Sequence, residues 1–109
     1  MENDSEIITN YSKPAYILGD WNPTMAPLIL IQPESVMAKK GQEASFNVEV
    51  AAIPEASYQW FKNGKVITGA TKAVLHFKNV SAIDEGNYSV TIKNRLGSVK
   101  SYDATLIVM

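Results

Sequence analysis

A length of 109 residues, with no cysteine, one histidine, 46% hydrophobic residues and a formal net charge of −1, is the profile of one small domain. Without cysteine there can be no disulfide or thiolate metal site, and one histidine leaves too few ligands for a zinc or non-haem iron centre, so we expect no cofactor. The near-neutral charge argues against nucleic acid as a partner, and no apolar run reaches the roughly 20 residues that a membrane-spanning helix needs.

The chain begins with an acidic segment. Residues 1–26 contain four acidic residues and one lysine, hence a charge of −3, whereas nine basic and seven acidic residues give residues 27–109 a charge of +2. Prolines bracket the boundary, and proline interrupts helices and favours extended backbone in the residue before it. We therefore predict an extended N-terminal arm over residues 1–26 and one domain over residues 27–109. The acidic start is unlike a secretory signal, which predicts synthesis in a cytoplasm.

The arm is richer in aromatic residues than a solubilising tail would be, since it holds three of the ten in the chain. We predict that it anchors the molecule on a protein partner through Tyr11, Tyr16, Ile17, Leu18 and Trp21. The alternative is that the arm folds back along the domain and covers an edge strand, as segments of native proteins often do.

From Leu28 onward, apolar residues recur with a period of two, which predicts an all-β domain. Residues 43–51 alternate apolar and polar side chains, as a strand with one wet face does. The next strand places Tyr58 and Trp60 on the same face. It ends at Asn63-Gly64, a dipeptide that suits a type I′ hairpin turn because both residues tolerate positive φ.

The remaining strands are separated by turn residues. They are predicted over residues 65–68, 73–80 and 86–94, and from a hairpin at 94–97 to the C-terminus. In the strand over 86–94, alternation predicts that Ser89 faces outward. Short strands at regular spacing indicate a sandwich of two sheets rather than one parallel sheet.

Three core positions carry a family pattern. Val48, Trp60 and Val90 have the spacing of the Cys, Trp and Cys of an immunoglobulin domain, and Tyr88 stands two residues before the last of them. Residues 28–108 thus resemble an immunoglobulin-like domain of the I-set type. The resemblance implies a two-sheet Greek-key sandwich without a disulfide, in which packing of the two valines on Trp60 replaces the bridge.

The resemblance also assigns roles near residue 88. It implies that Tyr88 forms a tyrosine corner, in which its hydroxyl bonds to the backbone a few residues upstream, and that Gly86 permits the tight turn before the strand. The residues that we expect to determine the fold are Phe46, Val48, Trp60, Leu75, Asp84, Gly86, Tyr88 and Val90.

Two segments narrow the resemblance. Residues 58–64 (YQWFKNG) and 94–101 (NRLGSVKS) are similar to segments of the cysteine-free immunoglobulin-like repeats of bacterial surface proteins and tailed-phage virion proteins. Within that group the chain resembles phage head decoration proteins. This implies a place on the capsid exterior, the major capsid protein as partner of the arm, and weak attachment to host or environmental glycans. The alternatives are an intracellular scaffold module of the muscle type, located in the cytoplasm, and a repeat of a bacterial surface protein.

No residue pattern indicates catalysis. His76 has the outward parity of its strand, and no motif ties a serine or carboxylate to it. The pair Asp84-Glu85 lacks the alternating acidic residues of a calcium-binding loop. We therefore predict a non-catalytic structural or binding protein.

Overall fold

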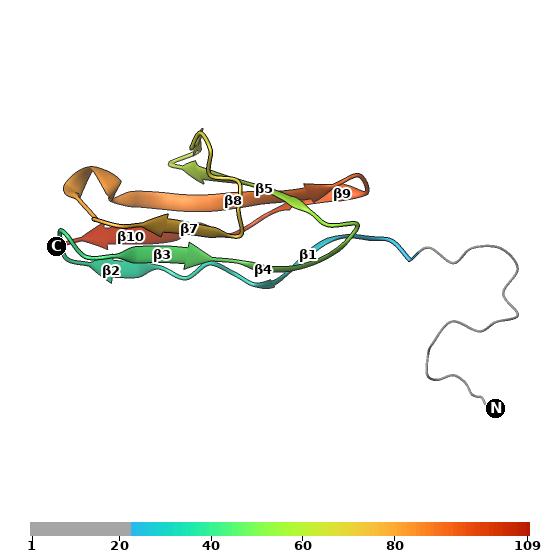
Figure 1. Cartoon of the computed structure of the whole chain (residues 1–109), viewed down its shortest axis with the longest axis horizontal. Helices are drawn as coiled ribbons and strands as arrows, with labels where there is room; N and C mark the ends of the chain where they lie inside the picture. The colour runs from blue at the N-terminus through green and yellow to red at the C-terminus, as the bar shows by residue number, and fades with distance from the viewer. Residues whose placement is uncertain (1–22) are drawn as a thin grey trace, which may run out of the picture.

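A computed structural model of the chain describes residues 23–109 (Figure 1). A three-residue 3₁₀ turn, η1 (Ala82–Asp84), accompanies the strands. The strands are β1 (Met25–Ile31), β2 (Val36–Ala38), β3 (Ala44–Asn47), β4 (Glu49–Ile53), β5 (Ser57–Lys62), β6 (Lys65–Val66), β7 (Val74–Phe77), β8 (Gly86–Asn94), β9 (Gly97–Lys100) and β10 (Ala104–Val108). The predicted all-β fold class is confirmed. Within residues 23–109, no helix has the length and apolar character needed to cross a membrane.

The strands form two layers (Figure 1). One layer is a sheet centred on β8, with β5 along one edge and β10 and β9 along successive halves of the other. In this sheet β6 extends beyond β5, and β2 joins β10 in parallel. In the second layer β7 pairs with β3 and β1 pairs with β4, all antiparallel. This is the two-sheet sandwich that the spacing of strands predicted.

Two strands that were predicted as continuous are interrupted. Residues 43–51 divide into β3 and β4 at Val48, whose amide donates to the Ala73 carbonyl oxygen at 3.1 Å. The C-terminal strand divides into β9 and β10 at the buried Ser101. Its amide donates to the Val90 carbonyl oxygen at 2.9 Å, and its hydroxyl accepts from the Val90 amide at 3.0 Å. The ladder along β8 therefore continues across the break.

The first strand begins earlier than the predicted boundary at residue 27. β1 starts at Met25, which pairs with Ile53. Pro27 lies inside β1 at a shift of register. Proline has no N–H to donate to a ladder, and an edge strand tolerates it at such an irregularity. The Asn94 side-chain amide holds this end of β1, since it donates to the carbonyl oxygens of Met25 at 2.8 Å and Pro54 at 3.0 Å.

The hairpin after β5 has the predicted backbone, with φ of 50° at Asn63 and 83° at Gly64. The returning strand β6 is only two residues long, shorter than the predicted 65–68. The chain leaves the strand there because the Ile67 amide turns back to the Trp60 carbonyl oxygen at 3.0 Å.

The core between the layers is aromatic. Trp60 is fully buried, and the Phe46 ring is stacked against it with 6.2 Å between centroids. The Tyr88 ring lies 5.1 Å from that of Phe46. Val48 and Val90, at the family's cysteine positions, are 4% and 0% exposed. Burying a valine contributes about 1.5–3 kcal/mol, so hydrophobic packing occupies the place of the bridge.

Two side chains are less or more buried than alternation alone suggests. Leu75 faces inward opposite Phe46 but is only half-buried, since β7 is a short strand at the margin of its layer. The prediction of an outward-facing, wet Ser89 is wrong about its exposure: the residue is 4% exposed. It lies at the centre of the sheet directly opposite Phe61, a large side chain on the same face.

Candidate functional site

The turn before β8 is a structural site. The Tyr88 hydroxyl donates to the main-chain carbonyl oxygen of Asp84, the arrangement of a tyrosine corner. The Asp84 carboxylate caps η1 by accepting from the Ser81 amide at 2.8 Å. Burial, together with the Asp84 charge, raises the pKa of Tyr88 to about 12, so the hydroxyl remains a donor. A Cβ on Gly86 would come within 3.1 Å of the Asn63 Oδ1 atom, so glycine allows this close approach.

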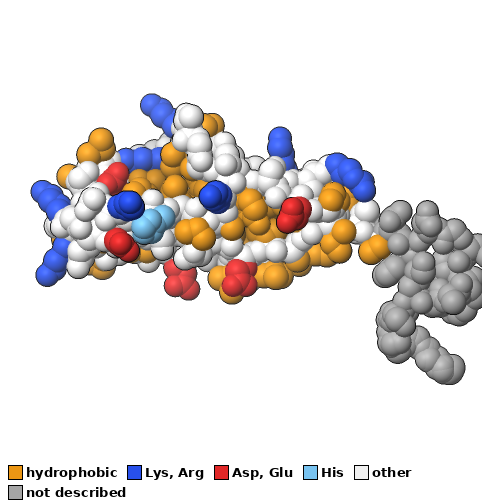
Figure 2. All heavy atoms as spheres, in the orientation of Figure 1, with side chains coloured by type: hydrophobic (Ala, Val, Ile, Leu, Met, Phe, Trp, Pro, Cys, Tyr) orange, Lys and Arg blue, Asp and Glu red, His pale blue; other side chains and the backbone are white. Residues whose placement is uncertain are grey.

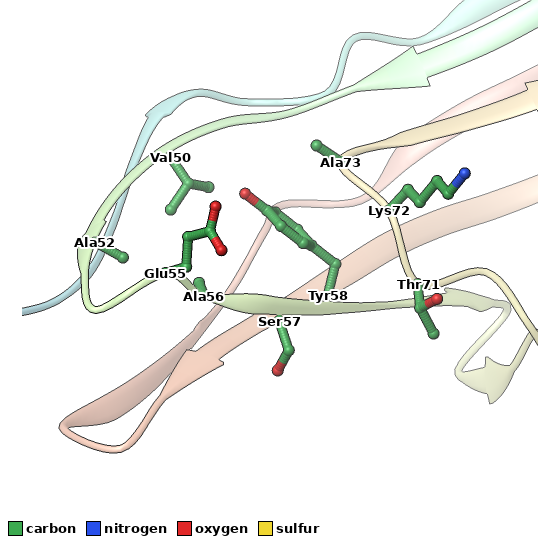
Figure 3. Close-up of a pocket in the computed structure, with 9 residues that line it drawn as sticks. All are labelled: Val50, Ala52, Glu55, Ala56, Ser57, Tyr58, Thr71, Lys72 and Ala73. Atoms are coloured by element: carbon green, nitrogen blue, oxygen red, sulfur yellow. The ribbon is translucent and has the colours of Figure 1, made fainter.

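A cleft of about 660 Å³ opens between the two layers, where β4 and β5 diverge (Figure 3). The Tyr58 side chain points from β5 across the cleft toward Val50 on β4, and the Glu55 side chain points toward the same space. The segment before β7 forms the third wall. The lining residues are Val50, Ala52, Glu55, Ala56, Ser57, Tyr58, Thr71, Lys72 and Ala73.

The third wall is held in place by the core tryptophan. The Trp60 indole N–H donates to the Lys72 carbonyl oxygen at 2.7 Å, and the Trp60 amide donates to the Ala70 carbonyl oxygen at 2.9 Å. The Gln59 side-chain amide donates to the Ile67 carbonyl oxygen at 2.8 Å. Residues 67–72 are therefore fixed against β5 without forming a strand.

The cleft stays open because its walls are small. Three of the lining residues are alanines, whose methyl groups do not reach across the gap above the Tyr58 ring. In Figure 3 the Lys72 side chain extends away from Tyr58, whereas the Glu55 carboxylate lies on the side of the phenol hydroxyl. The cleft thus combines an apolar floor with a carboxylate and a hydroxyl at one end.

Such an arrangement suits binding rather than covalent chemistry. His76 lies on β7 outside the cleft, with a side chain 46% exposed and its Nε2 atom 3.6 Å from the exposed Glu43 carboxylate. Over residues 23–109, no three potential metal ligands come together. Glu85 accepts a hydrogen bond from the Val108 amide at 2.9 Å, which gives the Asp84-Glu85 pair two separate structural contacts.

A second exposed surface, which we call the β1 patch, consists of Leu28, Leu30, Ile31 and Ile53. Their exposed fractions are 55%, 57%, 51% and 46%. Figure 2 shows hydrophobic side chains gathered along the margin where β1 and β4 lie. The exposed Glu49, which pairs with Ile31, borders the patch.

The sequence marks loops 52–57, 68–73 and 94–98 as candidate binding loops without a distinguishing residue, and the cleft is lined by residues of the first two. The β1 patch was not singled out. For the patch a signal was present, because residues 25–31 read MAPLILI and offer no polar side chain for a wet face. The cleft depends on which residues meet between layers, which alternation does not report. The predicted anchoring residues lie outside the described range 23–109, so their role stays a prediction: Tyr11, Tyr16, Ile17, Leu18 and Trp21.

Comparison with known proteins gives a family and several relatives. The family described as "Immunoglobulin domain" matches residues 26–94. Titin of Drosophila melanogaster is 32% identical over 88 residues, covering 72% of this chain and a share of titin that rounds to 0%. IgLON family member 5 of Homo sapiens is 34% identical over 83 residues, covering 66% of this chain and 25% of that protein. The chain thus spans a quarter or less of these relatives.

Solved structures agree. The titin M4 domain superposes with a TM-score of 0.72 at 25% identity, covering 80% of this chain and 99% of that chain. The titin domains Z1Z2 in complex with telethonin give a TM-score of 0.71 at 26% identity, covering 80% of this chain and 49% of that chain. These relatives favour the muscle-type alternative, and the comparisons give no support to the finer resemblance to phage head decoration proteins.

Proposed function

The chain belongs to the immunoglobulin domain family, and from this premise we propose that it is a non-catalytic scaffold module that binds a protein partner. The observation that carries the proposal is the cleft at Tyr58, an opening of about 660 Å³ between the layers with a carboxylate at its rim. Function resides in such a site rather than in the fold, because the same sandwich serves many purposes.

The relatives support this assignment. The titin domains Z1Z2 were solved in complex with telethonin, so in that relative domains of this fold assemble with another protein. The valines at positions 48 and 90 make the domain independent of an oxidising compartment, which suits a cytoplasmic scaffold. We include the cytoplasmic location in the proposal. The capsid partner, the glycans and the virion exterior stay predictions from sequence.

The chemistry of the cleft suggests what the partner presents. An arginine or lysine has an apolar stem and a cationic end, and such side chains bury the stem while the charge seeks a polar partner. Here the stem would lie on the Tyr58 ring and the alanine walls, and the cation would meet the Glu55 carboxylate. Lys72 extends away from that end and leaves room for an incoming positive charge. We therefore propose a partner with an exposed basic side chain in an apolar setting.

Mapping the contact by NMR tests the proposal. The isotope-labelled chain is titrated with a short arginine-containing peptide and, separately, with the same peptide carrying glutamate. We expect amide shifts centred on Tyr58, Glu55 and Ala73 with the arginine peptide, and none there with the glutamate peptide. Shifts scattered over the surface, or equal responses to both peptides, would overturn the assignment of the cleft.

A further inference from the structure

We propose that the β1 patch is the docking surface for residues 16–21 of this same chain, which add an antiparallel strand along β1. The inference is independent of the cleft, because none of the four β1 patch residues lines it. It decides between the two roles that the sequence left open for the arm.

Among residues 23–109, β1 is paired along one side only, with β4. No strand of the described residues pairs with its other side, although Gly97 of β9 lies close to Ala26 near its start. Pro27 has no N–H to donate near the start of β1, but alternate residues from Leu28 to Ile31 direct their N–H and C=O groups to the unpaired side. An exposed strand edge of this kind is a template for another strand, and native proteins usually cover it.

The apolar side chains of β1 are also exposed. Three neighbouring apolar side chains, Leu28, Leu30 and Ile31, are each more than half exposed. A row of large exposed aliphatic side chains on one strand marks a surface that something covers. A strand laid along β1 would shield their flanks and satisfy the free main-chain groups together.

The position of the arm identifies the occupant. Only residues 22–24 separate the proposed strand from Met25, the first residue of β1. A connection this short holds the attached segment at an effective concentration in the millimolar range, far above that of a free partner. The connection contains Asn22-Pro23, residue types that favour chain reversal. Residues 16–18 read Tyr-Ile-Leu, rich in residue types that favour strands.

Charge agrees with this placement. Residues 1–26 carry a net charge of −3. The start of β1 is tied to the end of β8 through Asn94, and the exposed basic residues Lys93 and Arg95 flank Asn94. Opposite charges therefore lie where the acidic arm enters the domain, and the attraction favours a path back over the domain rather than away from it.

The test uses the full chain with matched substitutions in the arm. In one variant Ile17 and Leu18 both become serine, and in the control Ile7 and Ile8 both become serine, which removes the same kind of apolar surface from a part of the arm outside the proposed contact. Amide hydrogen exchange is measured by NMR at Leu28, Leu30 and Ile31. We expect at least tenfold faster exchange for at least one of these amides in the Ile17 and Leu18 variant, and unchanged rates in the control.

A second measurement distinguishes the two candidate occupants of the β1 patch, the arm of the same chain and a second copy of the chain. Nuclear Overhauser contacts between Ile17 or Leu18 methyls and Leu28 or Leu30 methyls are recorded in a mixture of labelled and unlabelled chains. We expect contacts within one chain, independent of concentration. Contacts only between chains would show that a second copy covers the patch and would overturn the proposal. The proposal would also be overturned if no such contacts were seen and the wild type, the Ile17 and Leu18 variant and the control all had equal exchange rates.

Discussion

Tyr58 and Trp60 lie two residues apart on the same face of β5, yet Trp60 is sealed in the core and Tyr58 borders an open cleft. The difference comes from what lies across the gap. Trp60 meets the Phe46 ring and pairs with Val90, whereas three of the residues that line the cleft around Tyr58 are alanines. Alternation along a strand thus sets the face of a residue, and the size of its neighbours in the other layer sets whether that residue is sealed in the core or left beside an open cleft.

The largest effect is expected when the sealed aromatic residue is removed. Trp60→Ala should lower the free energy of unfolding by about 3–5 kcal/mol, because it leaves a cavity under Phe46 and frees the Lys72 carbonyl oxygen. The free energy of unfolding of a small domain is about 5–15 kcal/mol in total, so this loss is a large share of it. Urea unfolding followed by circular dichroism measures this. A loss below about 1 kcal/mol would show that the core lies elsewhere.

The valines at the family's cysteine positions come next. Val48→Ala should cost about 1–3 kcal/mol, because the methyl groups removed are buried in the core of the sandwich. Val74→Ala is the matched control, since Val74 is 47% exposed, and it should change stability by no more than about 0.5 kcal/mol. Thermal unfolding of both variants checks the prediction, and equal losses would contradict it.

The tyrosine corner gives a prediction in pH. Because the pKa of Tyr88 is about 12 in the folded chain and 10.0 ordinarily, folding favours the protonated phenol. The stability from this hydroxyl is complete below pH 10 and is lost as pH rises from 10 toward 12. Tyr88→Phe should cost about 0.5–1.5 kcal/mol at pH 7 by removing the hydrogen bond to Asp84. Urea unfolding of both proteins at pH 7 and pH 11 should show this difference shrinking.

The smallest effect is expected at the open aromatic residue. Tyr58→Phe should change the free energy of unfolding by no more than about 0.5 kcal/mol, because its side chain points into a cleft rather than a packed core. The same urea unfolding experiment measures it. A cost equal to that of Tyr88→Phe would mean that the Tyr58 hydroxyl has a structural partner, and the contrast between the two positions on β5 would fail.

Much of the fold could be predicted from period-two alternation and turn chemistry. Alternation placed Phe46, Trp60 and Val90 on inward faces, and the two positive φ values at Asn63-Gly64 follow from residue types alone. The exposure of a side chain was harder to predict than its face. The exposure of Ser89, for example, depends on Phe61 in a neighbouring strand. The cleft could not be predicted, since it arises where the alanines of three separate segments fail to fill space above Tyr58.

The most direct test of the central claim is the affinity of the full chain for the arginine-containing peptide when the Glu55 carboxylate is neutralised. Glu55→Gln should weaken binding about tenfold, which corresponds to about 1.4 kcal/mol for one charge-assisted contact. Glu43→Gln removes an exposed carboxylate 3.6 Å from His76 on β7, outside the cleft, and should leave the affinity unchanged. Equal affinities of the wild type and Glu55→Gln would contradict the assignment of the cleft as a binding site for a basic side chain.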